Sequence, residues 1–123
     1  MASKVLIVDD EPNIVTSLEF LMRRKGYETR VAADGDLALE EAERFQPDIV
    51  LLDVMLPRRD GFEVCQQLRA TGRSDLKIVM LTAKGRETEI AKGMAMGADA
   101  YVTKPFSTRE LVDRVAHLLE GGS

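Results

Sequence analysis

The sequence predicts an α/β protein in which an open sheet of five parallel strands is covered by helices on both faces. Two observations support this fold class. Short apolar runs rich in branched residues alternate with longer segments whose apolar residues recur at helical spacing, and the connections between them are short. The chain of 123 residues is also far shorter than the roughly 250 residues of a closed eight-unit barrel. We therefore expect five strand–helix units forming one domain, residues 1–123, with 119–123 as a tail or the start of a linker.

The expected strands differ in polarity, and this difference places them in the sheet. They span residues 5–8, 28–32, 49–52, 78–81 and 100–103. The run 49–52, Ile-Val-Leu-Leu, is apolar throughout, as is typical of a strand buried on both faces of a parallel sheet. The run 28–32, Glu-Thr-Arg-Val-Ala, is short and more polar, so we place it near a sheet edge.

The first two helices have clear start and stop signals. Pro12 suits a first helical turn, where its missing N–H needs no partner, and Gly26 ends that helix. The second helix is expected to begin at about Asp36 and to end before Pro47.

Of the last three helices, the third and fifth have clear start signals and the fourth has a weak apolar pattern. Asp60 and Ser107 each precede a glutamate by three residues, a capping-box pattern that opens the third and fifth helices. The fourth helix, roughly 87–96, contains a glycine and is expected to rest its apolar face on Ile90 and Met94. We expect it to be the most mobile helix.

Composition argues against several classes of function. The net charge of −4 and the absence of Trp leave neither a basic surface nor many stacking platforms for nucleic acid, and the charge gives no attraction to anionic membranes. No apolar run approaches the ~20 residues of a membrane span, and the start Met-Ala-Ser-Lys does not resemble a signal peptide. A single cysteine, Cys65, suits a reducing compartment and is expected in the core. We place the protein in the cytoplasm, without direct contact to nucleic acid or membrane.

Residues whose side chains could bind a metal ion or take part in a reaction stand at the ends of four of the five strands. These are Asp9 and Asp10, Asp53, Thr82, and Lys104. Because the carboxyl ends of parallel strands share one edge of the sheet, where open α/β sheets bind ligands, these side chains are expected to converge. Any one of them alone could be a helix cap or a solvated loop residue, but their coincidence at four strand ends favours a common site.

Such a cluster predicts a metal ion and a nucleophile. Clustered carboxylates raise one another's pKa unless a cation intervenes, and an all-oxygen ligand set with open water positions suits Mg²⁺ better than Ca²⁺ or Zn²⁺. An aspartate beside Mg²⁺ and a lysine is a candidate nucleophile toward phosphorus, giving an aspartyl phosphate. The charge on the phosphoryl oxygens would then meet the metal, Lys104 and Thr82.

Four motifs at this spacing resemble one known family over nearly the whole chain. They are Val-Asp-Asp-Glu-Pro at 8–12, Leu-Leu-Asp-Val-Met-Leu-Pro at 51–57 with Asp-Gly at 60–61, Leu-Thr-Ala at 81–83, and Gly-Ala-Asp-Ala-Tyr-Val-Thr-Lys-Pro-Phe at 97–106. The chain resembles a response-regulator receiver domain of bacterial two-component signal transduction. This resemblance implies a flavodoxin-like (βα)5 three-layer sandwich with strand order 2-1-3-4-5.

The resemblance also implies a phosphorylation site with Mg²⁺ as its cofactor. Asp53 would accept a phosphoryl group from a phosphohistidine on a sensor histidine kinase or phosphotransfer protein. Asp9, Asp10, Asp53 and the backbone carbonyl of Met55 would hold Mg²⁺. The protein would catalyse its own phosphorylation and slow dephosphorylation, yet act as a regulatory switch and not as an enzyme with turnover.

The same resemblance implies how the signal leaves the site. Thr82 and Lys104 would bind the phosphoryl oxygens, and Lys104-Pro105 would be a cis peptide. Tyr101 would turn inward when Thr82 moves toward the phosphate, because phosphorylation adds about −1.5 to −2 charges and three acceptors there. The face formed by helix 4, strand 5 and helix 5 would relay the change to an effector domain or target protein.

Three residues near the expected site vary within this pattern. Met55 and Lys84 occupy the two variable positions that flank the phosphate. The Met55 side chain cannot orient a water molecule for attack, so slow self-dephosphorylation is expected. Arg59 stands where the family more often has an apolar residue, and either a role in partner choice or a neutral surface change fits the sequence.

Three alternatives belong to other functional classes. A phosphatase of the haloacid dehalogenase type would need Asp-x-Asp after the first strand and a cap domain, whereas the acids here are adjacent. A flavodoxin proper would need a phosphate loop of Ser, Thr and Gly, where this chain has Asp-Asp-Glu. The third alternative is a receiver-like interaction module that is not regulated by phosphorylation.

Overall fold

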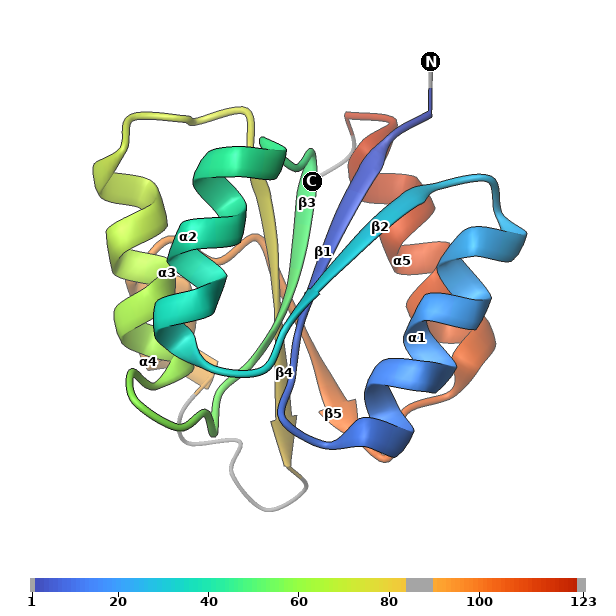
Figure 1. Cartoon of the computed structure of the whole chain (residues 1–123), viewed down its shortest axis with the longest axis horizontal. Coiled ribbons are helices and arrows are strands. Elements are labelled where there is room, and N and C mark those ends of the chain that lie inside the picture. The colour runs from blue at the N-terminus through green and yellow to red at the C-terminus, as the bar shows by residue number, and fades with distance from the viewer. Residues whose placement is uncertain (1, 84–89, 122–123) are drawn as a thin grey trace.

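The computed structural model describes residues 2–83 and 90–121 and has three layers, a parallel sheet between two layers of helices (Figure 1). The strands are β1 (Lys4–Val8), β2 (Glu28–Ala32), β3 (Ile49–Asp53), β4 (Lys77–Ala83) and β5 (Ala100–Lys104). The helices are α1 (Pro12–Arg24), α2 (Gly35–Phe45), α3 (Gly61–Ala70), α4 (Ile90–Ala95) and α5 (Thr108–Leu119). Neighbouring strands are parallel, in the order β2-β1-β3-β4-β5. The predicted flavodoxin-like order 2-1-3-4-5 is confirmed.

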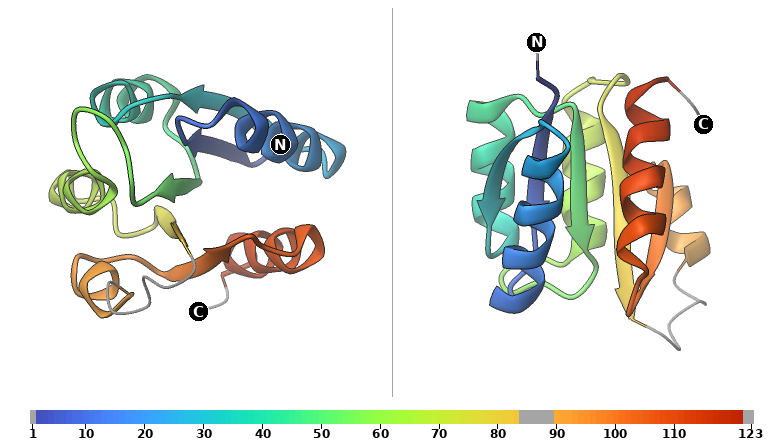
Figure 2. Two further views of the ribbon diagram at one scale, coloured as in Figure 1. Left: turned by 90° about the horizontal axis from the view of Figure 1, so that it is seen from below. Right: turned by 90° about the vertical axis from the view of Figure 1, so that its right-hand side faces the viewer.

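Alternation along the central strands creates one core on each face of the sheet. Val5 and Ile7 of β1 face α1 and α5, whereas Leu6 and Val8 face α2 and α3. Figure 2 shows α1 and α5 on one side of the sheet and the remaining helices on the other. Every residue of β3 is buried, as its uninterrupted apolar run predicted. The edge strand β2, by contrast, alternates between exposed and more buried residues.

The helix boundaries mostly follow the signals in the sequence. Pro12 is the first residue of α1, and Gly26, with φ of +87°, adopts a left-handed conformation just after its end. The second helix begins one residue before the expected Asp36, because Asp34 caps it: Asp34 Oδ1 accepts a hydrogen bond of 2.8 Å from the Leu37 amide. No helix in the described part of the chain is long and apolar enough to cross a bilayer.

Both predicted capping residues of the later helices are found. Asp60 Oδ1 accepts from the Glu63 amide at 2.9 Å, and Ser107 Oγ accepts from the Glu110 amide at 3.3 Å. Each cap satisfies one of the amides that a first helical turn leaves without an intrahelical partner. These caps fix where α3 and α5 start, directly after the loops that follow β3 and β5.

Helix α4 packs differently from the prediction. Its expected start near residue 87 lies outside the described residues, and Met94 is 44% exposed instead of facing the core. The buried residue is Gly93: a Cβ placed there would lie 3.5 Å from Phe62 and 3.6 Å from Met80. The helix therefore turns a glycine, and not an apolar side chain, toward Phe62 of α3 and Met80 of β4.

Candidate functional site

The carboxyl ends of four strands meet at one edge of the sheet. Asp9 follows β1, Asp53 ends β3, and Lys104 ends β5. Thr82 lies in β4, one residue beyond Leu81, the register partner of Asp53. The parallel register thus brings together residues that are up to 95 positions apart in the sequence.

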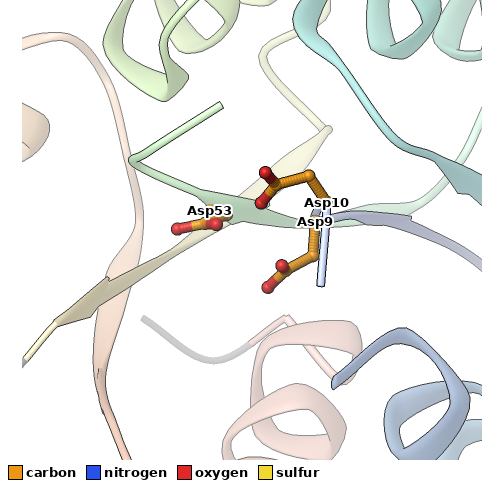
Figure 3. A group of neighbouring side chains, drawn as sticks. All are labelled: Asp9, Asp10 and Asp53. Atoms are coloured by element: carbon orange, nitrogen blue, oxygen red, sulfur yellow. The ribbon is translucent and has the colours of Figure 1, made fainter. Parts of the chain in front are cut away.

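Asp9, Asp10 and Asp53 form a compact acidic cluster (Figure 3). Each offers a carboxylate oxygen, and these oxygens lie within 4.8 Å of one another. Asp9 is fully buried and Asp53 is 5% exposed, whereas Asp10 faces solvent. Backbone amides hold the two buried carboxylates: the Glu11 amide donates to Asp9 Oδ1 at 2.9 Å, and the Met55 amide donates to Asp53 Oδ1 at 3.2 Å.

The ammonium group of Lys104 lies against this cluster. Its Nζ is 2.8 Å from Asp9 Oδ2 and 3.5 Å from Asp53 Oδ2. A third carboxylate, Glu11, lies 3.4 Å away and was not among the residues singled out from the sequence. In the sequence, Glu11 belongs to the Val-Asp-Asp-Glu-Pro motif at 8–12 and directly follows the Asp-Asp pair. The lysine offsets part of the negative charge that burial would otherwise make costly.

Burial and neighbouring charges shift the pKa values of both Asp53 and Lys104. Burial, and next the charge of Asp9, raise the pKa of Asp53 to about 6, although Lys104 and the Met55 amide favour its ionised form. Burial acts to lower the pKa of Lys104, but its hydrogen bond to Asp9 and the nearby carboxylates outweigh this and raise the pKa. At neutral pH the site therefore contains a charged lysine beside a mostly ionised Asp53.

Thr82 has a buried hydroxyl without a hydrogen-bond partner among the described residues. A buried hydroxyl with no partner is costly, so this oxygen is available to a group that enters the site. A small hollow beside it is lined by Thr82, Tyr101, Phe62, Met80 and Met94, among others. Tyr101 itself is 40% exposed. The two residues expected to act as the switch thus border the same hollow.

The donor set at the cluster fits a hard divalent cation. Among the described residues, the candidate side-chain ligands are all carboxylate oxygens, and one of them belongs to Asp10, which is exposed to solvent. Oxygen ligands with retained water are the environment that Mg²⁺ prefers. Met55 lies in the loop directly after Asp53, and Lys84, the other variable position, lies outside the described residues.

A family model for the response regulator receiver domain matches residues 5–116. The chain belongs to this family. Among solved structures, a response regulator of Chloroflexus aurantiacus J-10-fl described as putative is 38% identical with a TM-score of 0.91, and the match covers 98% of this chain and 99% of that one. Membership of the receiver family implies phosphorylation-regulated signalling by a regulatory switch.

Two further matches show receiver domains in different settings. The BeF3-activated DrrB receiver domain is 33% identical with a TM-score of 0.89, and the match covers 98% of this chain and 99% of that chain. NtrX from Brucella abortus is 29% identical with a TM-score of 0.91, and the match covers 98% of this chain but only 27% of NtrX. A receiver domain of this kind therefore occurs both as a separate structure and as one part of a longer chain.

Two further expectations are confirmed, and Arg59 has contacts that the sequence did not predict. The Lys104-Pro105 peptide is cis, as the resemblance implied. Cys65 is fully buried, as expected of a core residue. Arg59 makes specific contacts, described below, that nothing in the sequence motifs pointed to.

Proposed function

We propose that this protein is a cytoplasmic signalling switch that accepts a phosphoryl group on Asp53 from a sensor histidine kinase or a histidine phosphotransfer protein. The observation that supports this most directly is the environment of Asp53. Its carboxylate is buried at the end of β3, within 3.5 Å of the Lys104 ammonium and close to Asp9 and Asp10. With a pKa of about 6, Asp53 is mostly ionised at neutral pH, so a carboxylate oxygen is available as nucleophile.

In the proposed reaction, an Asp53 oxygen attacks the phosphorus of a phosphohistidine. The new O–P bond forms as the N–P bond breaks, and the imidazole nitrogen leaves with the electron pair of that bond. Asp9, Asp10, Asp53 and the main-chain carbonyl of Met55 would hold Mg²⁺, which supplies positive charge for the phosphoryl oxygens. Lys104 stays charged throughout because neighbouring carboxylates raise its pKa.

The proposed output begins at Thr82. Its buried hydroxyl has no partner among the described residues, so a phosphoryl oxygen would give it one. Movement of Thr82 toward that oxygen would enlarge the hollow that it shares with Tyr101, and the exposed ring could then enter. This change would alter the face formed by α4, β5 and α5, which would transmit the signal to an effector domain or a target protein.

Phosphorylation by a small acyl phosphate tests this function without a kinase. With the acyl phosphate and MgCl₂, the wild-type protein should incorporate phosphate, and incorporation should stop on addition of EDTA. Asp53→Ala should abolish it, whereas Asp75→Ala, which removes an exposed carboxylate after α3, should not. Unchanged incorporation in Asp53→Ala would refute the assignment. Absence of incorporation in the wild type would favour an interaction module that is not regulated by phosphorylation.

A further inference from the structure

Arg59 joins two segments that are distant in the sequence. Its Nε donates a hydrogen bond of 2.7 Å to Asp36 Oδ1 in the first turn of α2. Its Nη1 lies 4.0 Å from Glu63 Oε2 in α3. Arg59 thus connects the β3–α3 loop, residues 54–60, with the first turn of α2. Both partners of the shorter contact are about half exposed, at 41% and 51%.

The base of this loop is fixed independently of Arg59. The Gly61 amide donates to the Val54 carbonyl at 2.8 Å, which closes the loop directly after Asp53. Gly61 also lies so close to the Asp53 carbonyl that a side chain there would collide with it. These contacts hold the backbone of Gly61 against Asp53 and Val54 without any contribution from the Arg59 side chain.

The tip of the loop is held against the amino end of α2. Arg58 has φ of +72°, a conformation that non-glycine residues rarely adopt and that needs support from its surroundings. The Pro57 carbonyl accepts from the Gly35 amide at 3.2 Å and from the Arg59 amide at 2.8 Å. A Cβ on Gly35 would lie only 2.5 Å from the Arg59 Cβ and from its carbonyl oxygen. The two backbones are therefore in direct contact, and the Arg59–Asp36 ion pair closes over that contact.

We propose that Arg59 and Asp36 act as a clamp that positions the β3–α3 loop for cation binding at the acidic cluster. This inference rests on the proposed function, since it concerns the same metal site. Met55, whose main-chain carbonyl is the proposed fourth protein ligand, lies between the fixed base and the clamped tip. Its amide donates to Asp53 Oδ1 at 3.2 Å, so a displaced loop also disturbs the orientation of that carboxylate. Arg59 touches neither the cluster nor Lys104 and is therefore a positioning residue.

The direction in which Mg²⁺ affinity changes in Arg59→Ala distinguishes a clamp from a simple effect of charge. If only charge mattered, Arg59→Ala would remove a positive charge near the cluster and strengthen Mg²⁺ binding, while Asp36→Ala would weaken it. A clamp predicts that both variants weaken binding, because each releases the same loop. An exposed ion pair contributes little, so the expected loss in affinity is about two- to fivefold.

Calorimetric titration of the unphosphorylated protein with MgCl₂ tests the clamp. We expect both single variants to weaken Mg²⁺ binding and the double variant to be no weaker than the weaker single one. Arg44→Ala is the matched control, because it breaks an ion pair of 3.2 Å with Glu40 on the same helix and away from the loop. Its affinity should equal that of the wild type.

Gly35→Ala perturbs the loop without removing either charge. Alanine is favoured over glycine in a helix, so α2 itself should not weaken. The added Cβ would collide with Arg59 and displace the loop, and we expect weaker Mg²⁺ binding together with a shifted Met55 amide resonance. In Arg59→Ala the same resonance should shift, and this readout holds even where Gly35→Ala fails to fold.

Two results would overturn the clamp. If Arg59→Ala binds Mg²⁺ as tightly as the wild type or more tightly, while the wild type needs Asp53 for binding, the clamp is wrong and the proposed metal site stands. If wild-type binding is absent or unaffected by Asp53→Asn, the metal site fails and the clamp fails with it.

Discussion

Lys104 Nζ lies 2.8 Å from Asp9 Oδ2, and that carboxylate is completely buried. The lysine thus places a positive charge beside the carboxylates of Asp9, Glu11 and Asp53. This charge stabilises the buried carboxylate when no other cation is bound, and it repels a cation that enters. Lys104 therefore affects stability and metal affinity in opposite directions.

Lys104→Met should make both effects visible. Removing one partner of a buried ion pair leaves Asp9 uncompensated, so the free energy of unfolding should fall by about 3 kcal/mol in EDTA. Mg²⁺ should bind several-fold more tightly because a competing charge is gone. Urea denaturation and calorimetry measure the two changes. Lys25→Met, at an exposed position after α1, should change neither, and an unaltered Mg²⁺ affinity in Lys104→Met would contradict the prediction.

Asp53 should make stability depend on pH. Its pKa is raised from 3.8 to about 6 in the folded protein, so only well below pH 3.8 is the carboxyl protonated in both states and without effect. As pH rises from about 4 through about 6, the unfolded chain ionises first and the folded state loses relative stability. In EDTA, Asp53→Asn should therefore raise the free energy of unfolding at pH 7.5 by about 2–3 kcal/mol, but by less than about 1 kcal/mol at pH 4. An equal difference at both pH values, measured by urea denaturation, would contradict this.

Met55 should make the phosphorylated state long-lived. Its side chain is 56% exposed beside Asp53 and has no group that could orient a water molecule toward the phosphorus. We expect the aspartyl phosphate to decay over minutes or longer, and Met55→Asn to shorten its lifetime several-fold. Decay is followed after removal of the phosphate donor. A lifetime of seconds in the wild type would contradict the prediction.

Arg69 should contribute more to stability than any exposed arginine. Its guanidinium donates to the carbonyls of Gly97 at 2.8 Å and Leu76 at 2.6 Å, and it pairs with Asp99 at 2.7 Å. Asp99 in turn accepts from the Ile78 amide at 2.7 Å, so the cluster joins α3 to the segments before β4 and β5. Arg69→Ala should lower the free energy of unfolding by about 2–4 kcal/mol, because it leaves several partly buried acceptors without a donor. Arg44→Ala should cost less than about 0.5 kcal/mol in the same urea titration.

Hydrophobic periodicity and the residues at the strand ends were sufficient to predict the layers and the residues at the carboxyl edge. The strand order was predicted from the resemblance to the receiver family. The apolar run before Asp53 predicted a buried strand, and in a parallel sheet its carboxyl end shares one edge with the end of β5, which carries Lys104. The contacts of Arg59 and Arg69 had no such signal. Arg59 pairs with Asp36, 23 residues earlier, and Arg69 binds mainly backbone carbonyls, which any sequence offers.

The error at α4 has a different cause. Met94 was expected to pack inward because an apolar residue at helical spacing usually does. The helix turns Gly93 toward the side chains of Phe62 and Met80, and Met94 is 44% exposed. Which side of a short helix faces the core is decided by the three-dimensional arrangement, and a search for apolar side chains passes over a glycine on that side.

The distribution of the site over four strands makes the protein suitable for fragment complementation. A cut in the α3–β4 connection, for example after Arg73, would leave Asp9, Asp10 and Asp53 on one piece and Thr82 and Lys104 on the other. The cut lies at the amino end of β4, at the opposite edge of the sheet from the acidic cluster. Only reassembly would return the lysine to the carboxylates, so restored phosphate incorporation would report that the two halves had met.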